Sequence, residues 1–443
     1  MNDVASRYRD FLILLWQHGF LQDGGLTLAD GTPVEILRPG TAPGRDEGPD
    51  FAHAAIHYPE IDLTLHGSVK VDCRSSDWRT AGDVSDPAFD GLILHVVAEH
   101  DHLIMRNERA VPTLVVVPPP RLEELYRDLL AGRSGKSCVQ FVTGLDPLYR
   151  DQIVSRVMSD RLNRKSGEIL DILDSVGGDW HETTYIAFMR AFGYKERKKA
   201  YEQLARSMPY RHLRLHSDNR LSLEAMLLGQ AGYLEIRHPD DYTRQLQDEY
   251  ISLRRRYNLL PHPLKWRVEA MRPQFMPAQS LARIASILAR EESLLERVLT
   301  SGNVYELTAV FDILLPEYWQ GHYVPSHPSS GGPVAYGTTR RQIDLLMINF
   351  VIPLWVAYGI RHSNEELREK ALDLYESIKP EENRITRHWA SEGMAIDNAF
   401  VSQAVIQIAT EYCSKGLCAS CPVGAERLRR LHRETVRGPE RPE

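Results

Sequence analysis

The feature that most constrains this fold is a change in hydrophobic period near residue 120. Before that point, short apolar runs alternate with Gly, Pro and Asp, a pattern typical of β-strands joined by turns. After it, apolar residues recur at i, i+3 and i+4, which is typical of amphipathic helices. The segment VVVPPPR (115–121) ends the first part, because consecutive prolines cannot continue a strand ladder. The sequence therefore predicts an α+β domain over 1–120, with a mixed β-sheet and a flanking helix, followed by a large all-helical domain over 121–443.

The first part contains one predicted helix and several predicted strands. An amphipathic helix is expected over 4–19. Apolar and polar residues roughly alternate between Leu63 and Val71, which is the period of a half-buried strand. LILHVV (92–97) is almost continuously apolar and is expected to be a central strand. The predicted strands cover 33–39, 53–58, 61–73, 92–100, 102–106 and 113–118.

Charge and hydropathy limit the classes of partner. The net charge of −7 over 443 residues gives no global basic field for nucleic acid, although local basic surfaces remain open. The N-terminal apolar run is short and lacks a small-residue cleavage site. INFVIPLWVAYGI (348–360) is expected to be too short for a bilayer and broken by Pro353. We therefore expect a cytoplasmic protein without a membrane partner.

Carboxylates and a base lie on two neighbouring predicted strands. RDEGPDF (45–51) places Asp46, Glu47 and Asp50 in a turn before one strand. In the next strand, Lys70, Asp72 and Arg74 point to one face because alternate residues of a strand share a face.

Asp50, Asp72 and Arg74 match the arrangement of metal-dependent nucleases. In those enzymes a proline-aspartate and an acid-x-base triplet hold Mg²⁺ and orient the attacking water. The match is imperfect, since arginine does not lose its proton and is a poor general base. The alternative is an Asx-turn at Asp50 and a solvated strand face. The sequence thus predicts a candidate Mg²⁺ site at Asp50 and Asp72.

A second candidate set surrounds His95. Asp77, Asp83 and Asp86 lie in the preceding turn-rich segment, and His95 lies within the apolar strand. Together they would suit a metal-site enzyme of another class. The alternative is a hydrogen-bonded core histidine.

Three of the five cysteines, Cys413, Cys418 and Cys421, form C-x4-C-x2-C near the end of the chain. In a reducing compartment such a group suggests zinc or an iron–sulfur cluster rather than disulfides. A fourth ligand is needed, and the sequence offers His432, Cys138 or Cys73. The alternative is a group of reduced thiols packed at a helix end.

Several stretches resemble a bacterial family catalogued only as a domain of unknown function. They include LLWQHGF, DGTPVEILRPG, the GPDF of DEGPDFAHAAI, SSDW, the LHVV of DPAFDGLILHVVAEHD and YCSKGLCASCPVG. The resemblance implies a polar cluster in the N-terminal domain that includes Asp50, Asp77, Asp86 and His95.

This chain departs from the family pattern at four positions. The family has Glu-x-His where Lys70 and Asp72 stand, and histidines where Ala81 and Asp83 stand. A lysine in place of a carboxylate repels a divalent cation. The resemblance therefore implies an altered site in this member.

Two functions are carried forward from the sequence. The first is a nucleic-acid-processing protein with a nuclease-like, degenerate divalent-metal site in the N-terminal domain. The alternative is a non-catalytic scaffold for nucleic acid or protein with a structural metal site. Basic segments at 195–199, 254–257, 338–341 and 426–433 permit a phosphate-binding surface.

Overall fold

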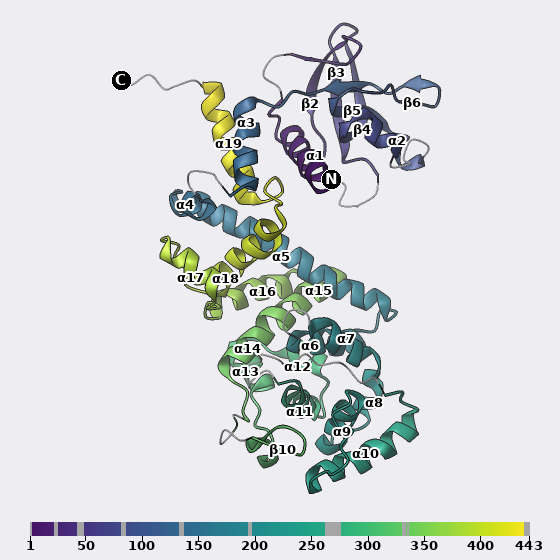
Figure 1. Ribbon diagram of the computed structural model, residues 1–443, viewed down its shortest axis with the longest axis vertical. Coiled ribbons are helices and arrows are strands. Elements are labelled where there is room, and N and C mark those ends of the chain that lie inside the picture. The colour runs from purple at the N-terminus through teal and green to yellow at the C-terminus, as the bar shows by residue number, and fades with distance from the viewer. Residues whose placement is uncertain are drawn as a thin grey trace. The chain divides into compact units, whose positions relative to one another are not determined.

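The computed structural model describes residues 2–21, 25–41, 48–80, 86–132, 137–193, 197–261, 276–329, 334 and 336–437. The chain forms two compact units. The first comprises Met1–Val157, Asn383–Ala395 and Ala404–Glu443, and the second comprises Met158–Glu382 and Ile396–Gln403. A mixed β-sheet region is followed by a largely helical region, which confirms the predicted α+β class (Figure 1). The change from strands to helices near residue 120 thus lies inside the first unit.

The first unit is built on a six-stranded sheet of order β1-β2-β3-β4-β5-β8. Its strands are β1 (Leu26–Thr27), β2 (Pro33–Arg38), β3 (Phe51–Tyr58), β4 (Leu63–Arg74), β5 (Leu92–Glu99) and β8 (Thr113–Val115). Strands β1 to β4 are antiparallel, and β4, β5 and β8 are parallel. A small separate ribbon joins β6 (Met105–Arg106) to β7 (Arg109–Ala110). The predicted segment 102–106 therefore contributes only two strand residues, and these lie outside the main sheet.

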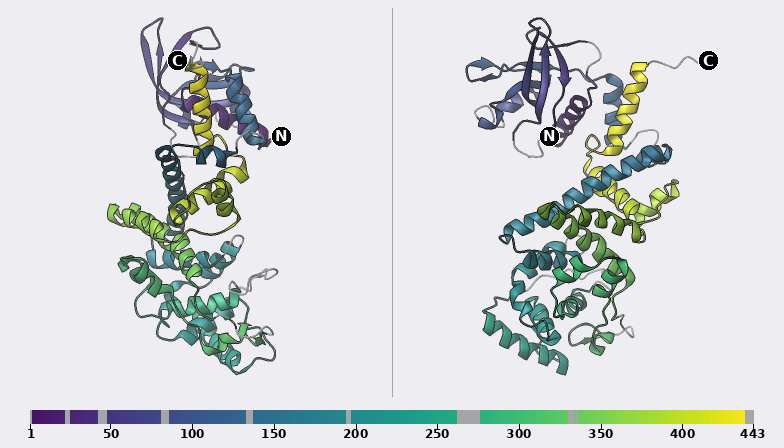
Figure 2. Two further views of the ribbon diagram at one scale, coloured as in Figure 1. Left: turned by 90° about the vertical axis from the view of Figure 1, so that its left-hand side faces the viewer. Right: turned by 180° about the vertical axis from the view of Figure 1, so that it is seen from behind.

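Helix α1 (Asn2–Gln17) packs against β4 and supplies much of the first unit's core (Figure 2). Its apolar residues Phe11, Leu15 and Trp16 are fully buried. The Phe11 ring stacks on Tyr126 at 4.5 Å. The buried Trp16 indole donates a hydrogen bond to the Pro39 carbonyl at 2.9 Å, so its polar atom is satisfied. The predicted N-terminal helix is present, displaced by two residues.

The remaining elements of the first unit connect or cover this sheet. Helix α3 packs beside the C-terminal helix α19, as the views in Figures 1 and 2 agree. The elements that connect or cover the sheet are α2 (Ser75–Thr80), η2 (Pro87–Phe89), α3 (Pro120–Leu130), α4 (Cys138–Thr143), α17 (Arg384–Ser391), η6 (Ile408–Tyr412), η7 (Cys413–Lys415) and α19 (Pro422–Arg437). Helices α5 (Pro147–Ser175) and α18 (Ala399–Gln407) contribute to both units.

The second unit is helical, with one two-stranded ribbon. Its innermost helix is α11, in which every residue is buried and which packs against α9. The elements are α6 (Trp180–Phe192), α7 (Arg197–Arg206), α8 (Tyr210–Arg214), α9 (Arg220–Gln230), α10 (Asp241–Tyr257), α11 (Pro277–Leu288), α12 (Leu294–Thr300), α13 (Val304–Phe311), η4 (Glu317–Gln320), β9 (His322–Val324), β10 (His327–Pro328), α14 (Arg340–Leu346), η5 (Met347–Val351), α15 (Ile352–His362) and α16 (Glu365–Ser377).

The apolar run around Pro353 differs from the sequence expectation of a broken segment. A continuous helix of 23 residues runs from Arg340 to His362. The wide π-turn η5 ends at Val351, two residues before Pro353, and it accommodates a residue that has no N–H to donate. By length and composition this helix could cross a membrane, but 72% of its apolar window is buried inside the protein. Its apolar surface therefore forms part of the second unit's core.

Candidate functional site

Polar side chains from three adjacent strands meet at one level of the sheet. Asp50 directly precedes β3, Lys70 and Asp72 lie on β4, and His95 lies on β5. The register pairs Lys70 with His95, so these residues are neighbours across the parallel ladder. Lys70, Asp72 and His95 are buried, with 5%, 6% and 0% exposure. Because unpaired charges are costly to bury, this cluster requires internal compensation.

Arg9 of α1 supplies that compensation by bridging the two carboxylates. Its Nη2 lies 2.6 Å from Asp50 Oδ1, and its Nε lies 3.3 Å from Asp72 Oδ1. The same Nε donates to the Val71 carbonyl at 2.8 Å, and the Val71 amide donates to Asp50 Oδ2 at 2.8 Å. Partial burial lowers the pKa of Arg9, but Asp50 and Asp72 outweigh this effect and raise it. The guanidinium is thus held charged between Asp50 and Asp72.

The second oxygen of Asp72 faces two further side chains. His95 Nε2 lies 3.0 Å from Asp72 Oδ2, and Lys70 Nζ lies 3.6 Å from the same atom. The Trp78 ring meets His95 edge-on at 5.2 Å, and Lys70 Nζ lies 5.3 Å from the Phe89 ring centre. Two carboxylates therefore face two protein cations, and the cluster is close to neutral without a metal ion.

The other residues predicted for this site lie elsewhere. Arg74 forms an ion pair of 3.1 Å with Glu99, and both side chains are about 60% exposed. Asp77 accepts the Arg74 amide at 2.9 Å and so caps α2, while Asp86 accepts the Ala88 amide at 2.8 Å and caps η2. The structure brings Asp50, Asp72 and His95 together, but not Arg74 or Asp77. Asp46, Glu47, Ala81 and Asp83 lie outside the described residues.

Sequence reasoning missed Arg9. The residue lies 41 positions before Asp50 and 63 before Asp72, with no motif to link it to either. The only local signal is a charged residue beside the buried Phe11, which also describes many surface residues. Across the described ranges, no three His, Cys, Asp or Glu side chains are placed to hold one metal ion.

The C-terminal cysteines lie where η7 leads into α19. Cys413 is exposed, Cys418 is partly buried and Cys421 is buried, and all are reduced thiols. Burial raises the pKa of Cys418 to about 11 and that of Cys421 to about 12, and it also raises that of Cys413. Cys138, at the start of α4, also contributes to the raised pKa of each of these three thiols. Four of the five cysteines therefore belong to one neighbourhood.

The other two fourth-ligand candidates lie in different surroundings. Cys73 is on β4, where burial and then the nearby carboxylates of Asp77 and Asp72 raise its pKa to about 11. The His432 ring packs on Phe20 with 4.7 Å between ring centres. Of the three candidates, the structure brings Cys138 toward the C-x4-C-x2-C segment.

A cleft of about 310 Å³ lies beside this segment. Its polar lining includes Gln17, His18, Arg156, Ser420 and Arg429. Arg429 Nη2 lies 3.2 Å from His18 Nε2. Burial and then the charges of Arg429 and Arg156 lower the pKa of His18 to about 4. The imidazole is therefore neutral at pH 7. Glu426 also lines the cleft and lies 3.3 Å from Arg429 Nη1, so the charged lining consists of two arginines and one carboxylate.

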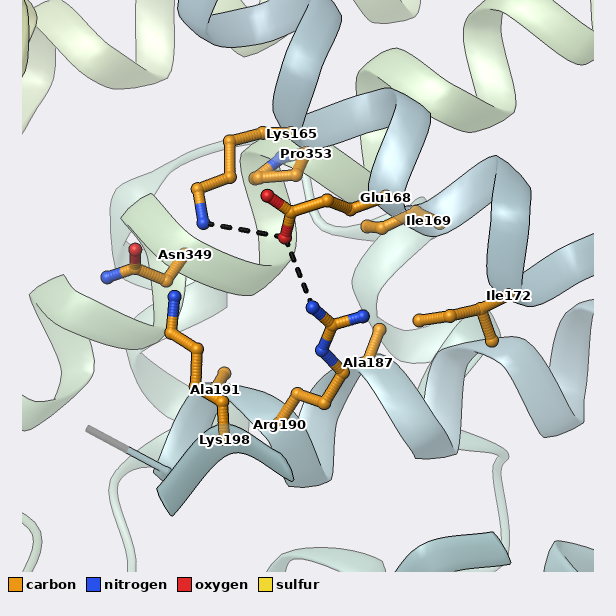
Figure 3. Close-up of a pocket in the computed structure, with 10 residues that line it drawn as sticks. All are labelled: Lys165, Glu168, Ile169, Ile172, Ala187, Arg190, Ala191, Lys198, Asn349 and Pro353. Atoms are coloured by element: carbon orange, nitrogen blue, oxygen red, sulfur yellow. Dashed lines mark hydrogen bonds and ion pairs between the residues drawn. The ribbon is translucent and has the colours of Figure 1, made fainter. Parts of the chain in front are cut away.

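A third polar cluster lies in the second unit and was also missed by sequence reasoning (Figure 3). Glu168 Oε2 lies 3.2 Å from Arg190 Nη2 and 3.7 Å from Lys165 Nζ. Burial and then the charge of Lys198 lower the pKa of Lys165 to about 7. The adjoining cavity measures about 30 Å³, which suits a water molecule rather than a substrate. We therefore place the candidate functional site in the first unit.

Comparison with known protein families matches residues 9–384 to DUF2851, described as a protein of unknown function. No curated protein and no solved structure matches the chain. The matched range includes Arg9, Asp50, Asp72 and the main part of the second unit, Met158–Glu382, and it ends before the C-x4-C-x2-C segment. Because the match covers most of the chain, this protein belongs to the DUF2851 family.

Proposed function

We propose that the first unit binds nucleic acid and carries a degenerate nuclease-type site, in which protein cations replace the divalent metal. The observation that carries this proposal is the Arg9 bridge between Asp50 and Asp72. In a metal-dependent nuclease, the paired carboxylates hold Mg²⁺, which activates water and neutralises developing charge. Here a guanidinium is already in contact with both carboxylates. We infer that the chain binds phosphodiesters without cleaving them.

Electrostatics disfavours Mg²⁺ while these cations remain in place. Mg²⁺ requires near-octahedral oxygen coordination at about 2.0–2.1 Å. Arg9 and Lys70 already contact Asp72, and Arg9 also contacts Asp50. An incoming ion would lie within a few ångströms of two positive charges, which repel it strongly in a buried site. Mg²⁺ binding at Asp50 and Asp72 would therefore require Arg9 to withdraw.

The cleft beside the C-terminal segment supports nucleic acid as the ligand. Its volume of about 310 Å³ is at the lower end for a ligand site. Arg156 and Arg429 in its wall suit a phosphate group, because guanidinium donors match phosphate oxygens, although Arg429 also pairs with Glu426 at 3.3 Å. Helix α19 continues this basic character with the sequence ERLRRLHR. Local positive surface thus exists despite the net charge of −7.

Binding and cleavage are tested together on labelled single- and double-stranded DNA and RNA. We expect binding that weakens linearly with log salt, because phosphate contacts release counterions. Arg156→Ala/Arg429→Ala should weaken binding about tenfold or more, whereas the exposed Arg127→Ala should leave it unchanged. No cleavage is expected with Mg²⁺ or Mn²⁺. Absence of binding at low salt would refute the nucleic-acid proposal.

The proposal that Arg9 and Lys70 exclude a metal ion from Asp50 and Asp72 is tested by replacing these two cations. Arg9→Gln/Lys70→Glu leaves carboxylates at positions 50, 70 and 72 facing one another. We expect Mn²⁺ binding in this variant by electron paramagnetic resonance, and none in the wild type. Arg74→Gln/Arg121→Glu changes the net charge equally at exposed positions and is the matched control. Metal-dependent cleavage by the wild type would instead support an active nuclease with Mg²⁺ at Asp50 and Asp72.

A further inference from the structure

We propose that Cys138, Cys413, Cys418 and Cys421 together hold a [4Fe–4S] cluster that fastens helix α19 to helix α4. This inference does not depend on the nucleic-acid proposal. Iron–sulfur clusters of this type use four cysteine thiolates. The chain has five cysteines, and these four come from two segments far apart in sequence.

Packing in the first unit brings Cys138 to the C-terminal segment. Cys138 is the first residue of α4, whose start is fixed by a Ser137–Gln140 capping box. Arg427 of α19 lies 289 residues away in sequence, yet its Nη1 lies 3.7 Å from Cys138 Sγ. Cys138 and Cys418 also pack against the same hydrophobic core. Helices α4 and α19 are therefore neighbours at the level of the cysteines.

The turn that carries the other three cysteines is shaped by two glycines. Gly416 adopts φ +68°, a left-handed conformation that glycine adopts readily and most residues rarely do. A Cβ at Gly424 would lie 2.1 Å from the Cys418 carbonyl oxygen, so that position admits no side chain. Together they fold the chain back between Cys413 and the first turn of α19. The tight turn holds Cys418 and Cys421 close to the helix N-terminus.

The surroundings suit a negatively charged cluster. The Val423 and Gly424 amides donate hydrogen bonds to the Cys421 sulfur. Arg427 contacts Cys138, and the Arg7 guanidinium packs against Gly416. Amide donors and cations near the sulfurs stabilise ligated thiolates. The negative charge of the thiolates would therefore be stabilised by the backbone amides at Cys421 and by the guanidinium groups of Arg427 and Arg7.

A four-iron cluster and a single zinc ion both take four thiolates, and they differ in how far apart they hold the sulfurs. Four thiolates around one zinc, with Zn–S near 2.3 Å, lie only about 3.8 Å from one another. A four-iron core ligates each sulfur at a different iron and so spans a wider group of ligands. We assign iron and sulfide to these cysteines, and metal analysis separates this assignment from a single zinc ion.

The test is metal analysis of full-length protein purified without oxygen and without a metal-binding tag. We expect about four iron and four sulfide per chain, with a broad visible absorption band. Cys138→Ser and Cys418→Ser should each lose most of the iron. Cys73→Ser is the matched control, because Cys73 lies on β4, and it should keep the full content. One zinc per chain, no metal, or a Cys138→Ser protein with unchanged iron would each overturn the proposal.

A second measurement does not require any variant to fold. Thiols of the native anaerobic wild type are alkylated, and the modified cysteines are identified by mass spectrometry. We expect Cys138, Cys413, Cys418 and Cys421 to be protected until the iron is removed with a chelator and oxidant, and then to react together. Cys413 is the sharpest case, since it is the exposed member of the four and, in the absence of a cluster, should be alkylated before the buried Cys421. Rapid alkylation of Cys413 or Cys138 in the untreated protein would contradict ligation.

Discussion

Arg9→Ala should destabilise the first unit by about 2–3 kcal/mol. The substitution removes hydrogen bonds to Asp50, Asp72 and the Val71 carbonyl. It leaves two carboxylates whose side chains are only 13% and 8% exposed. Breaking a fully buried ion pair costs about 3–5 kcal/mol. The estimate here is lower because the Arg9 side chain is 35% exposed, and because Asp72 keeps Lys70 and His95 as partners.

Hydrogen exchange of the Val71 amide is the direct assay, because this amide donates to Asp50 Oδ2. Exchange measured in rising urea should show a loss of protection of roughly 30- to 150-fold, equivalent to about 2–3 kcal/mol. Arg74→Ala is the control: it removes an exposed ion pair with Glu99 and should cost less than about 1 kcal/mol.

A double-mutant cycle separates the Arg9–Asp50 interaction from general damage to α1. Arg9→Ala combined with Asp50→Asn should destabilise by clearly less than the sum of the single changes, since each removes the charge that the other compensates. A coupling energy near zero would refute the bridge. So would an Arg9→Ala protein as stable as Arg74→Ala.

Two further predictions concern pH. The folded-state pKa of Lys165, about 7 against an ordinary 10.5, means that the stability of the second unit rises as pH increases from 7 toward 10. Lys165→Met should abolish that rise, as measured by urea unfolding at several pH values; an unchanged slope would contradict the assignment. His18 has a folded-state pKa of about 4 against 6.5, so stability of the first unit should fall as pH decreases through that window. His18→Gln should reduce this loss and shift acid unfolding to lower pH, and an identical acid transition would count against it.

The sequence predicted the strands well because their signal is local. Alternation from Leu63 to Val71 and the apolar run at 92–97 correspond to β4 and β5. The same patterns placed Asp50 beside β3 and Asp72 on β4, and these two residues do meet around Arg9. A face shared along one strand can be read from a period of two.

The remaining features depend on contacts between distant segments. Arg74 was grouped with Asp72 by strand alternation, yet it lies further along β4, where the strand is exposed, and pairs with Glu99. The partners of Arg9 and Cys138 could not be predicted from the sequence, because they depend on how α1 and α4 pack. Likewise, Pro353 was expected to break its apolar run, and the preceding π-turn explains why the helix continues through it.

Helix α1 contacts both the site formed by Asp50 and Asp72 and the turn that carries Cys413, Cys418 and Cys421. Arg7 packs against Gly416 in the turn, and its carbonyl accepts the Tyr126 hydroxyl at 2.7 Å. Arg9, two residues later, points to a different side of the helix and bridges Asp50 and Asp72. These contacts connect α1 to both sites. Coupling between two sites is reciprocal, so if displacing Arg9 from the carboxylates changes the hydrogen exchange of the turn at Gly416, a change at that turn must act equally on Arg9.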